Sequence, residues 1–239
     1  MFVRKFAGQI LGREATALLF LNVFATNIRS LRDQPCYHSS SLIPALHRYF
    51  LLNKPAGIVS QFVSSHAVGL LSDLGFDFPE GTHAIGRLDK DSEGLLLLTT
   101  DKSVTRRLFQ GEKPHARSYL VLVKGIVSEE TIQKLASGIA IPADNGLPYI
   151  TQPCAVEKVT DPQLYGDWIH PHPAHIPHDW LLISLTEGKF HQVRKMVFAA
   201  GHRCKRLIRV SIEDLTLEGI GPGEIREISG NLFYQKLYF

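Results

Sequence analysis

Cysteine is scarce in this 239-residue chain, and its three cysteines, Cys36, Cys154 and Cys204, never stand in a Cys-x-x-Cys spacing. An odd, widely separated set argues against a disulfide framework and against a thiolate zinc site, and it favours a reducing compartment. Long apolar runs are lacking as well, since no stretch approaches the roughly 20 residues needed to cross a bilayer. We therefore expect a cytoplasmic protein with no membrane span and no metal.

A strong surplus of either charge is also missing. Lys and Arg together number 26 and Asp and Glu together number 23, so the formal net charge is +3. Hydrophobic residues make up 44% and charged residues 21%, which is ordinary for a folded globular protein and argues against general disorder. A mild basic balance is compatible with a polyanionic partner but does not require one, so the placement of the charges matters more.

Residues 1–46 differ from the rest of the chain. Basic residues outnumber acidic ones there, a short apolar stretch spans residues 15–25, and three consecutive serines follow at 39–41. This pattern is typical of an organellar transit peptide or of a weak signal peptide, and an extension without a targeting role is the alternative. We expect a poorly ordered or targeting-like extension over 1–46 and one folded domain over 47–239, with organellar import as the alternative to a cytoplasmic location.

The remainder of the chain mixes apolar runs with amphipathic segments that carry capping residues. Helices are predicted where Asp101 and Ser128 can cap and where apolar residues recur at helical spacing. Strands are predicted over 49–52, 95–99, 118–124 and 180–188, and helices over 101–109, 128–138 and 189–200. Because strands and helices do not alternate strictly, we expect an α+β domain around a mixed or antiparallel sheet with flanking helices.

A dense charged loop precedes the apolar run at 95–99. Its sequence over 86–94 is Gly-Arg-Leu-Asp-Lys-Asp-Ser-Glu-Gly, with three carboxylates and two cations. It could be a solvated turn, a calcium loop, or a site where an aspartate oriented by arginine acts as nucleophile or as acid–base group. The calcium template fails, because Thr100 stands where a bidentate glutamate is required. Which carboxylate would react stays open at this point.

Basic residues are concentrated in two later segments. Lys189, His191, Arg194 and Lys195 surround the expected start of a helix, whose free N–H groups favour anions. The segment 202–209, His-Arg-Cys-Lys-Arg-Leu-Ile-Arg, adds five potentially basic groups. A solvated cationic face is the alternative, but the density of the two segments together favours a nucleic-acid footprint.

Several segments, taken in order, resemble a known family. They are the Gly-Arg-Leu-Asp loop with its leucine-rich run (86–99), the Lys-Phe-His-Gln-Val-Arg-Lys-Met segment (189–196), and two shorter ones, Arg-Leu-Ile-Arg and Gly-Pro-Gly-Glu, at 206–209 and 221–224. Their order and spacing over residues 49–229 resemble the RsuA-type pseudouridine synthases. The Asp-Ser-Glu-Gly form of the loop and the Pro-rich insertion before Trp180 resemble the RluE-like branch, which acts on large-subunit (23S) ribosomal RNA.

The resemblance implies the pseudouridine synthase fold with a central catalytic cleft, and a monomer that isomerises a flipped-out uridine without cofactor or metal. Asp89 would be the nucleophile and Arg194 its ion-pair partner, with Lys189 as the second candidate for that role. Tyr119 would stack on the target base, and Leu207 would lie beneath the uracil ring. Substrate-binding roles are implied for Arg87, Lys90, Lys189, His191, Gln192, Lys195, Leu207 and Arg209.

Two other functions stay open on this evidence: a catalytically silent RNA-binding or ribosome-assembly protein on the same fold, and the same chemistry on small-subunit ribosomal RNA or transfer RNA. The segment 170–178 holds four of the eleven histidines. Its prolines prevent regular ligand geometry, and no nearby Cys or carboxylate pair completes a metal spacing. We therefore expect an exposed insertion loop there, able to touch RNA backbone, rather than a metal site.

Overall fold

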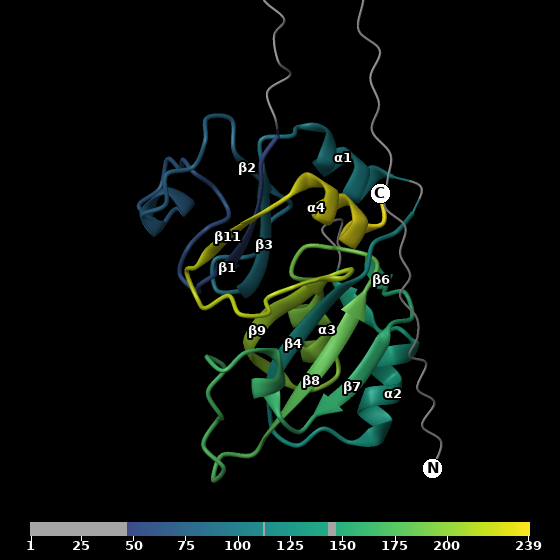
Figure 1. The fold of residues 1–239 in the computed structure, drawn as a ribbon. Coiled ribbons are helices and arrows are strands. Elements are labelled where there is room, and N and C mark those ends of the chain that lie inside the picture. The colour runs from purple at the N-terminus through teal and green to yellow at the C-terminus, as the bar shows by residue number, and fades with distance from the viewer. Residues whose placement is uncertain (1–46, 112, 143–146) are drawn as a thin grey trace, which may run out of the picture. The chain divides into compact units, whose positions relative to one another are not determined.

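A nine-stranded sheet runs through the part of the chain that the computed structural model describes, residues 47–239 apart from 112 and 143–146 (Figure 1). The expectation of a poorly ordered or targeting-like extension over 1–46 lies outside the described residues. The strands are β1 (Tyr49–Lys54), β2 (His83–Ile85), β3 (Glu93–Thr99), β4 (Arg117–Lys124), β7 (Ala155–Val159), β8 (His178–Leu185), β9 (Arg203–Ile212), β10 (Leu215–Thr216) and β11 (Ile225–Ile228). A separate two-stranded sheet pairs β5 (Ala140–Pro142) with β6 (Pro148–Ile150).

The large sheet is mixed but mostly antiparallel. Its order is β11-β1-β3-β9-β4-β8-β7, with β2 on β3 and β10 on β9. Only the β3–β9 pair is parallel among these neighbours, with Glu93 opposite Ile208 and Gly94 opposite Arg209. The helices are α1 (Ser103–Gln110), α2 (Glu129–Ser137), α3 (Gln192–Ala199) and α4 (Gly230–Leu237), with two 3-10 turns, η1 (Leu71–Leu74) and η2 (Pro162–Tyr165). The predicted α+β architecture is confirmed.

The apolar run in β3 is continuous because both of its faces are covered. Leu95 and Leu97 pack with residues of α1 and α4, while Leu96 and Leu98 pack into a second cluster on the opposite face. All four are fully buried, and complete burial of a leucine side chain stabilises a fold by roughly 1.5–3 kcal/mol. Figure 1 accordingly shows α1 and α4 together at one end of the domain. The strand that follows the charged loop is therefore a rigid support for it.

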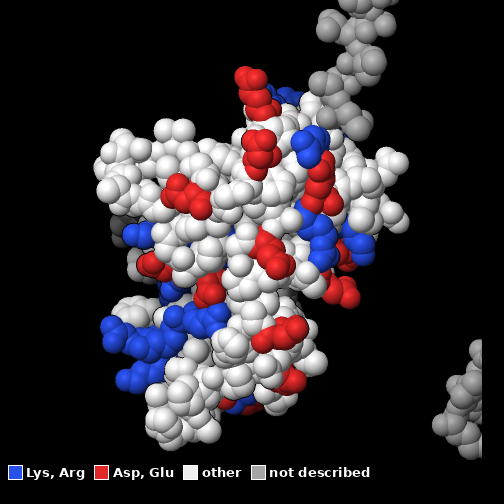
Figure 2. Space-filling model, turned by 60° about the vertical axis from the view of Figure 1, so that its left-hand side comes forward, with Lys and Arg blue, Asp and Glu red and all other residues white. Residues whose placement is uncertain are grey.

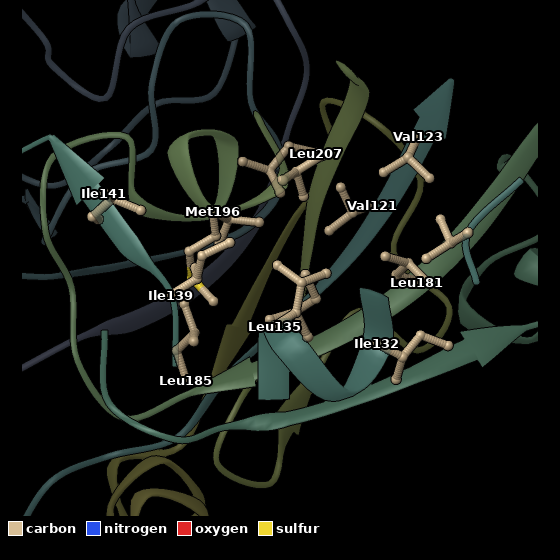
Figure 3. Close-up of a cluster of buried hydrophobic side chains, with 14 residues drawn as sticks. Val121, Val123, Ile132, Leu135, Ile139, Ile141, Leu181, Leu185, Met196 and Leu207 are labelled. Atoms are coloured by element: carbon tan, nitrogen blue, oxygen red, sulfur yellow. The ribbon is translucent and has the colours of Figure 1, made fainter. Parts of the chain in front are cut away.

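A second core lies at the other end of the domain. Alternate residues of β4 and β8, among them Val121, Val123 and Leu181, meet α2 and α3 on one face of the sheet. Figure 3 shows these side chains converging on Leu135 of α2 and Met196 of α3, both almost fully buried. This core fixes α3 against the sheet and so sets where the basic residues around its start can reach.

Most predicted elements are confirmed within a residue or two, but the strand predicted over 180–188 ends at Leu185 and the helix predicted over 189–200 begins later. Residues 188–191 form a loop, and α3 starts at Gln192. His191 takes a left-handed backbone conformation with φ 53°, which a continuous helix excludes. The later start matters, because it turns Lys189, Phe190 and His191 into loop residues. None of the helices that the structure describes has the length and apolar character needed to cross a membrane.

Asp101 lies just before α1, whose N-cap residue is Lys102, and it anchors that end of the domain. Its carboxylate accepts hydrogen bonds from Tyr234 (2.6 Å), Tyr49 (3.2 Å) and the backbone N–H of Ser103 (2.9 Å). Burial raises the pKa of Asp101, but the hydrogen bonds from Tyr234 and Ser103 outweigh it and lower the pKa from 3.8 to about 2. Because the folded-state pKa is depressed, the ionised carboxylate stabilises the fold above about pH 4, and this stabilisation is lost as the pH falls towards 2.

Asp101→Asn is therefore expected to lower the free energy of unfolding by about 2 kcal/mol at pH 7. Urea unfolding at several pH values measures this, and the difference from wild type should shrink as the pH is lowered through 3. Asp77 is exposed, so Asp77→Asn is the control and should change stability by less than about 0.5 kcal/mol. Equal stability of Asp101→Asn and wild type at pH 7 would contradict the anchoring role.

Candidate active site

The loop that carries Asp89 joins β2 to β3 and is held on both sides by backbone hydrogen bonds. On one side Ser60 and Leu88 bond reciprocally: the Leu88 N–H donates to the Ser60 hydroxyl, and that hydroxyl donates to the Leu88 carbonyl, each at 2.9 Å. On the other side the carbonyl of Lys90 accepts from the backbone N–H of Gly57 at 2.8 Å. Asp89 thus sits between two fixed neighbours.

Lys54, the last residue of β1, supports the same loop from below. Its side chain is fully buried, and its ammonium donates to the carbonyls of Ile58 (2.6 Å), Pro55 (2.9 Å) and Lys90 (3.3 Å). Burial lowers the pKa of Lys54 from 10.5 to about 8, against the opposing pull of nearby carboxylates. The lysine therefore ties the turn at 55–58 to the Asp89 loop by three hydrogen bonds.

The loop leaves through Gly94, which lies against β9. Gly94 has φ 102°, and a Cβ there would stand 2.3 Å from the carbonyl oxygen of Arg209. Only glycine satisfies both the left-handed backbone and this approach. Beside it Glu93 forms a bidentate ion pair with Arg206 of β9, with N–O distances of 2.7 and 2.9 Å. These contacts fix the height of the loop above the sheet.

A pocket opens between this loop, the strands β4, β8 and β9, and the loop before α3. Most of the residues predicted to be catalytic or to bind substrate line this pocket. Seven of the eleven line it: Arg87, Asp89, Tyr119, Lys189, His191, Gln192 and Leu207. Its apolar wall includes Leu185 and Val193, and Leu207 belongs to the core drawn in Figure 3. A carboxylate thus faces an aromatic ring and an apolar wall, with cations around them.

Asp89 has two basic side chains as neighbours. The Nε2 atom of His191 lies 3.4 Å from its Oδ1, and the Nε atom of Arg194 lies 4.0 Å from its Oδ2. Arg194 does not line the pocket; its guanidinium also donates to the carbonyl of Asp91 (3.0 Å) and to the hydroxyl of Ser92 (3.2 Å). The structure therefore places Arg194 beside Asp89, as predicted, but finds His191 closer and Lys189 without a contact to this carboxylate.

Asp89 and Asp91 occupy different environments, although the residue pattern left both eligible. The Asp89 side chain is 34% exposed and borders the pocket. Asp91 is an exposed residue that does not line the pocket. Ser92 further orients Asp89 by donating to its Oδ2 at 3.4 Å. The geometry selects Asp89 as the carboxylate that a bound molecule would meet.

Tyr119 reaches the pocket from β4, and the residue opposite it in β9 is Arg209. The sequence predicted a substrate-binding role for Arg209, but the structure contradicts direct contact. Arg209 is 3% exposed and does not line the pocket, and its Nε donates to the carbonyl of Leu95 at 2.7 Å. Burial lowers the pKa of Arg209, while Tyr119 opposes that shift. Strand register thus puts this arginine behind Tyr119 instead of on the surface.

The basic stretch at 202–209 is divided by strand alternation for the same reason. Arg203 and Lys205 are exposed, Arg206 pairs with Glu93, and Arg209 is buried. The predicted single footprint over this stretch is therefore wrong in part, since only some of its cations reach solvent. Figure 2 shows that Lys and Arg gather most densely at the lower left of one face, with a second group at its upper right, whereas Asp and Glu are scattered over the whole face.

The chain is similar to known proteins over most of its length. The family model described as RNA pseudouridylate synthase matches residues 48–199. The chain belongs to the RNA pseudouridylate synthase family. It is 37% identical over 193 residues to the ribosomal large subunit pseudouridine synthase E of Vibrio vulnificus, covering 79% of this chain and 78% of that one. It is 38% identical over 177 residues to the protein of that name from Xanthomonas axonopodis pv. citri, covering 72% and 89%.

A solved structure, titled crystal structure of pseudouridylate synthase, superposes with a TM-score of 0.64 at 29% identity and covers 80% of this chain and 74% of that one. The resemblance to RsuA-type, RluE-like enzymes is therefore confirmed, and this pseudouridine synthase is an isomerase. The matched range includes Asp89, Tyr119 and Arg194, whereas Leu207 and Arg209 lie beyond it.

Glu187 is a residue of the synthase pocket that sequence reasoning missed. Its carboxylate accepts from the hydroxyl of Tyr149, from the backbone N–H of Gln152 (2.8 Å) and from the side chain of Gln192 (2.6 Å). The other end of the Gln192 amide accepts from the N–H of Lys189 at 2.8 Å. Gln192, predicted to bind substrate, lines the pocket. Both ends of its side-chain amide, however, are hydrogen-bonded to Glu187 and Lys189, so the amide shapes the loop before α3. The only signal in the sequence for this hydrogen-bonding role of Glu187 is its position directly before Gly188 and Lys189.

The two remaining predicted residues lie outside the pocket. Lys90 is exposed and lines the adjoining cavity. Lys195 lies on α3, and its ammonium is 5.4 Å from the centre of the Phe190 ring. The loop at 166–177, which holds three of the predicted insertion's four histidines, leads into β8 at His178. Among the described residues no three His, Cys, Asp or Glu side chains are grouped as metal ligands.

Proposed function

We propose that the protein converts a uridine of ribosomal RNA into pseudouridine, with Asp89 as the nucleophile. The observation that carries this proposal is the placement of the Asp89 carboxylate at the wall of a pocket that also presents Tyr119 and Leu207. The Nε2 atom of His191 and the Nε atom of Arg194, at 3.4 and 4.0 Å from its oxygens, hold this carboxylate in place. An ionised, held carboxylate is the form that can attack carbon.

The reaction is balanced within the substrate. Asp89 attacks uracil C6 or ribose C1′, the bond between N1 and C1′ breaks, and the freed ring turns so that C5 bonds to C1′. The proton on C5 is lost to solvent, N1 gains a proton, and the carboxylate is released unchanged. Covalent attachment suits this sequence, because it divides one difficult exchange into steps. Attack on C6 would also tether the uracil while it turns, whereas after attack on C1′ the pocket walls would have to retain the ring.

Each remaining group has a part in holding the uridine. Tyr119 would stack on the uracil and replace the stacking that is lost when the base leaves its RNA helix, a step that costs a few kcal/mol. Leu207 and its apolar neighbours would cover the other side of the ring. Arg87 and Lys189, both exposed at the pocket rim, would contact phosphates, which position the RNA without reading its sequence.

The ribosomal large subunit is the favoured source of the uridine. Both relatives quoted above carry that subunit in their names, and they align over 72–79% of this chain. The specificity for one uridine would come from RNA shape and from contacts spread over the surface. Small-subunit ribosomal RNA and transfer RNA are the substrates against which this assignment has to be tested.

Release of tritium tests the proposal directly. Purified protein is incubated with unmodified large-subunit RNA, small-subunit RNA and transfer RNA transcripts, each labelled with tritium at uracil C5. Release from the large-subunit transcript is expected to reach about one equivalent per RNA, and mapping the new pseudouridine identifies the site. Absence of release from every transcript would overturn the proposed function, and release from another transcript alone would overturn the proposed target.

A further inference from the structure

Phe190, in the loop before α3, is unusual among the aromatic residues near the site. Its side chain is 62% exposed, and its ring is stacked on that of His191, with centroids 3.8 Å apart and planes 20° from parallel. His191 in turn approaches Asp89 at 3.4 Å. A single exposed aromatic side chain is common on proteins and signifies little by itself. Its position and neighbours are what distinguish this one.

Phe190 borders a second cavity that adjoins the catalytic pocket. The cavity has a volume of about 610 Å³, within the range of roughly 300–1,000 Å³ that small-molecule sites occupy. Asp89, Lys189 and His191 line both spaces, so a chain could pass from one into the other. The cavity is cationic on balance: Arg87, Lys90 and Lys189 line it, and Asp89 is its only carboxylate among the described residues.

We propose that Phe190 is a stacking platform for the unpaired nucleobase next to the target uridine, whose phosphate the surrounding cations bind. The inference rests on the proposed function for the identity of the ligand. An RNA strand with one uridine in the catalytic pocket must place the neighbouring nucleotides at the mouth of that pocket, and the second cavity opens there, since Asp89, Lys189 and His191 line both spaces. An exposed ring held by stacking on one side suits a base, because every base offers a π-face.

Lys195 competes for the same ring, since its ammonium lies 5.4 Å from the Phe190 centroid. An exposed cation–π contact strengthens an interaction by about 2- to 5-fold, whereas stacking of a base on an aromatic side chain is worth roughly 5- to 100-fold in affinity. The base therefore prevails over the ammonium. Once displaced from the ring, the Lys195 ammonium would contact the phosphate of the same nucleotide.

The test uses full-length protein and a fluorescent single-stranded RNA, heptauridylate with 2-aminopurine at position 3 or position 5. Stacking quenches 2-aminopurine, so quenching at saturation reports contact with the ring and requires no turnover. The variants are Phe190→Ala, which removes the platform, and Phe190→Trp, which keeps one. Phe198→Ala is the matched control, because Phe198 is 73% exposed on α3 and lines neither cavity.

Wild type, Phe190→Trp and Phe198→Ala are expected to quench one of the two probes, and Phe190→Ala to leave both bright. With the substrate RNA identified by tritium release, Phe190→Ala should raise KM by about 5- to 100-fold and leave kcat within about 2-fold. No quenching in the wild-type complex, or quenching and KM in Phe190→Ala equal to those of Phe198→Ala, would overturn the platform. Quenching that depends on Phe190 without any tritium release would instead overturn the proposed function.

Discussion

Asp89→Asn is expected to lower tritium release from substrate RNA by at least about 1,000-fold, because an amide lacks the charge needed to attack uracil C6 or ribose C1′. The substitution keeps the shape of the side chain. Binding of RNA should therefore stay within a few-fold of wild type, and the melting temperature should hardly change, since the loop is held by the backbone atoms of Leu88 and Lys90. Single-turnover tritium release with enzyme in excess separates the chemical step from binding.

Asp91→Asn is the control for this experiment. Asp91 is two residues away on the same loop and is exposed, and the bond it makes to Arg194 uses its backbone carbonyl. Its substitution should leave single-turnover release within about 3-fold of wild type, as surface changes usually do. Full activity of Asp89→Asn, or a collapse in Asp91→Asn alone, would show that the wrong carboxylate has been assigned.

Arg194→Ala is expected to reduce the single-turnover rate by about 100-fold, since it removes both a charge beside Asp89 and a brace for its loop. The guanidinium reaches Asp89, the carbonyl of Asp91 and the hydroxyl of Ser92 at once. Arg194→Lys should recover only part of the rate, because an ammonium lacks the planar fork that spans these partners. Rates are measured with RNA at saturation, so that weaker binding does not contribute.

Lys195→Ala tests whether a basic residue of α3 that lies outside the pocket affects RNA binding without affecting turnover. It lies next to Arg194 on α3, and its loss should weaken RNA binding with a shallower dependence of affinity on salt. The turnover of bound RNA should stay within about 3-fold of wild type. If both alanine variants changed only the affinity for RNA, Arg194 would be a phosphate ligand and its assignment as partner of Asp89 would fail.

The placement of His191 bears on the activity that remains in Arg194→Ala. It is nearer to Asp89 than Arg194 is, yet it is also the residue on which Phe190 stacks. A residual rate in Arg194→Ala is therefore expected, because the His191 ring still lies against the Asp89 carboxylate.

Local sequence determined much of this protein. The leucine run of β3 predicted a strand buried on both faces, and Asp101 and Ser128 marked helix starts that the structure places within two residues. Such features depend on neighbours a few positions apart, so periodicity and capping chemistry suffice to predict them. The motif around Asp89 likewise indicated the family, which the comparisons confirm.

The roles of several basic residues depended on contacts between distant segments, and only the tertiary structure decided them. Arg209 is buried because the β4–β9 register places it opposite Tyr119, inside the large sheet. His191 approaches Asp89 because its own left-handed backbone conformation keeps it in the loop before α3. Sequence by itself determined that a charged loop would stand before a buried strand. Which carboxylate faces the pocket, and which cations reach it, followed from strand register and helix placement, which residue type alone does not encode.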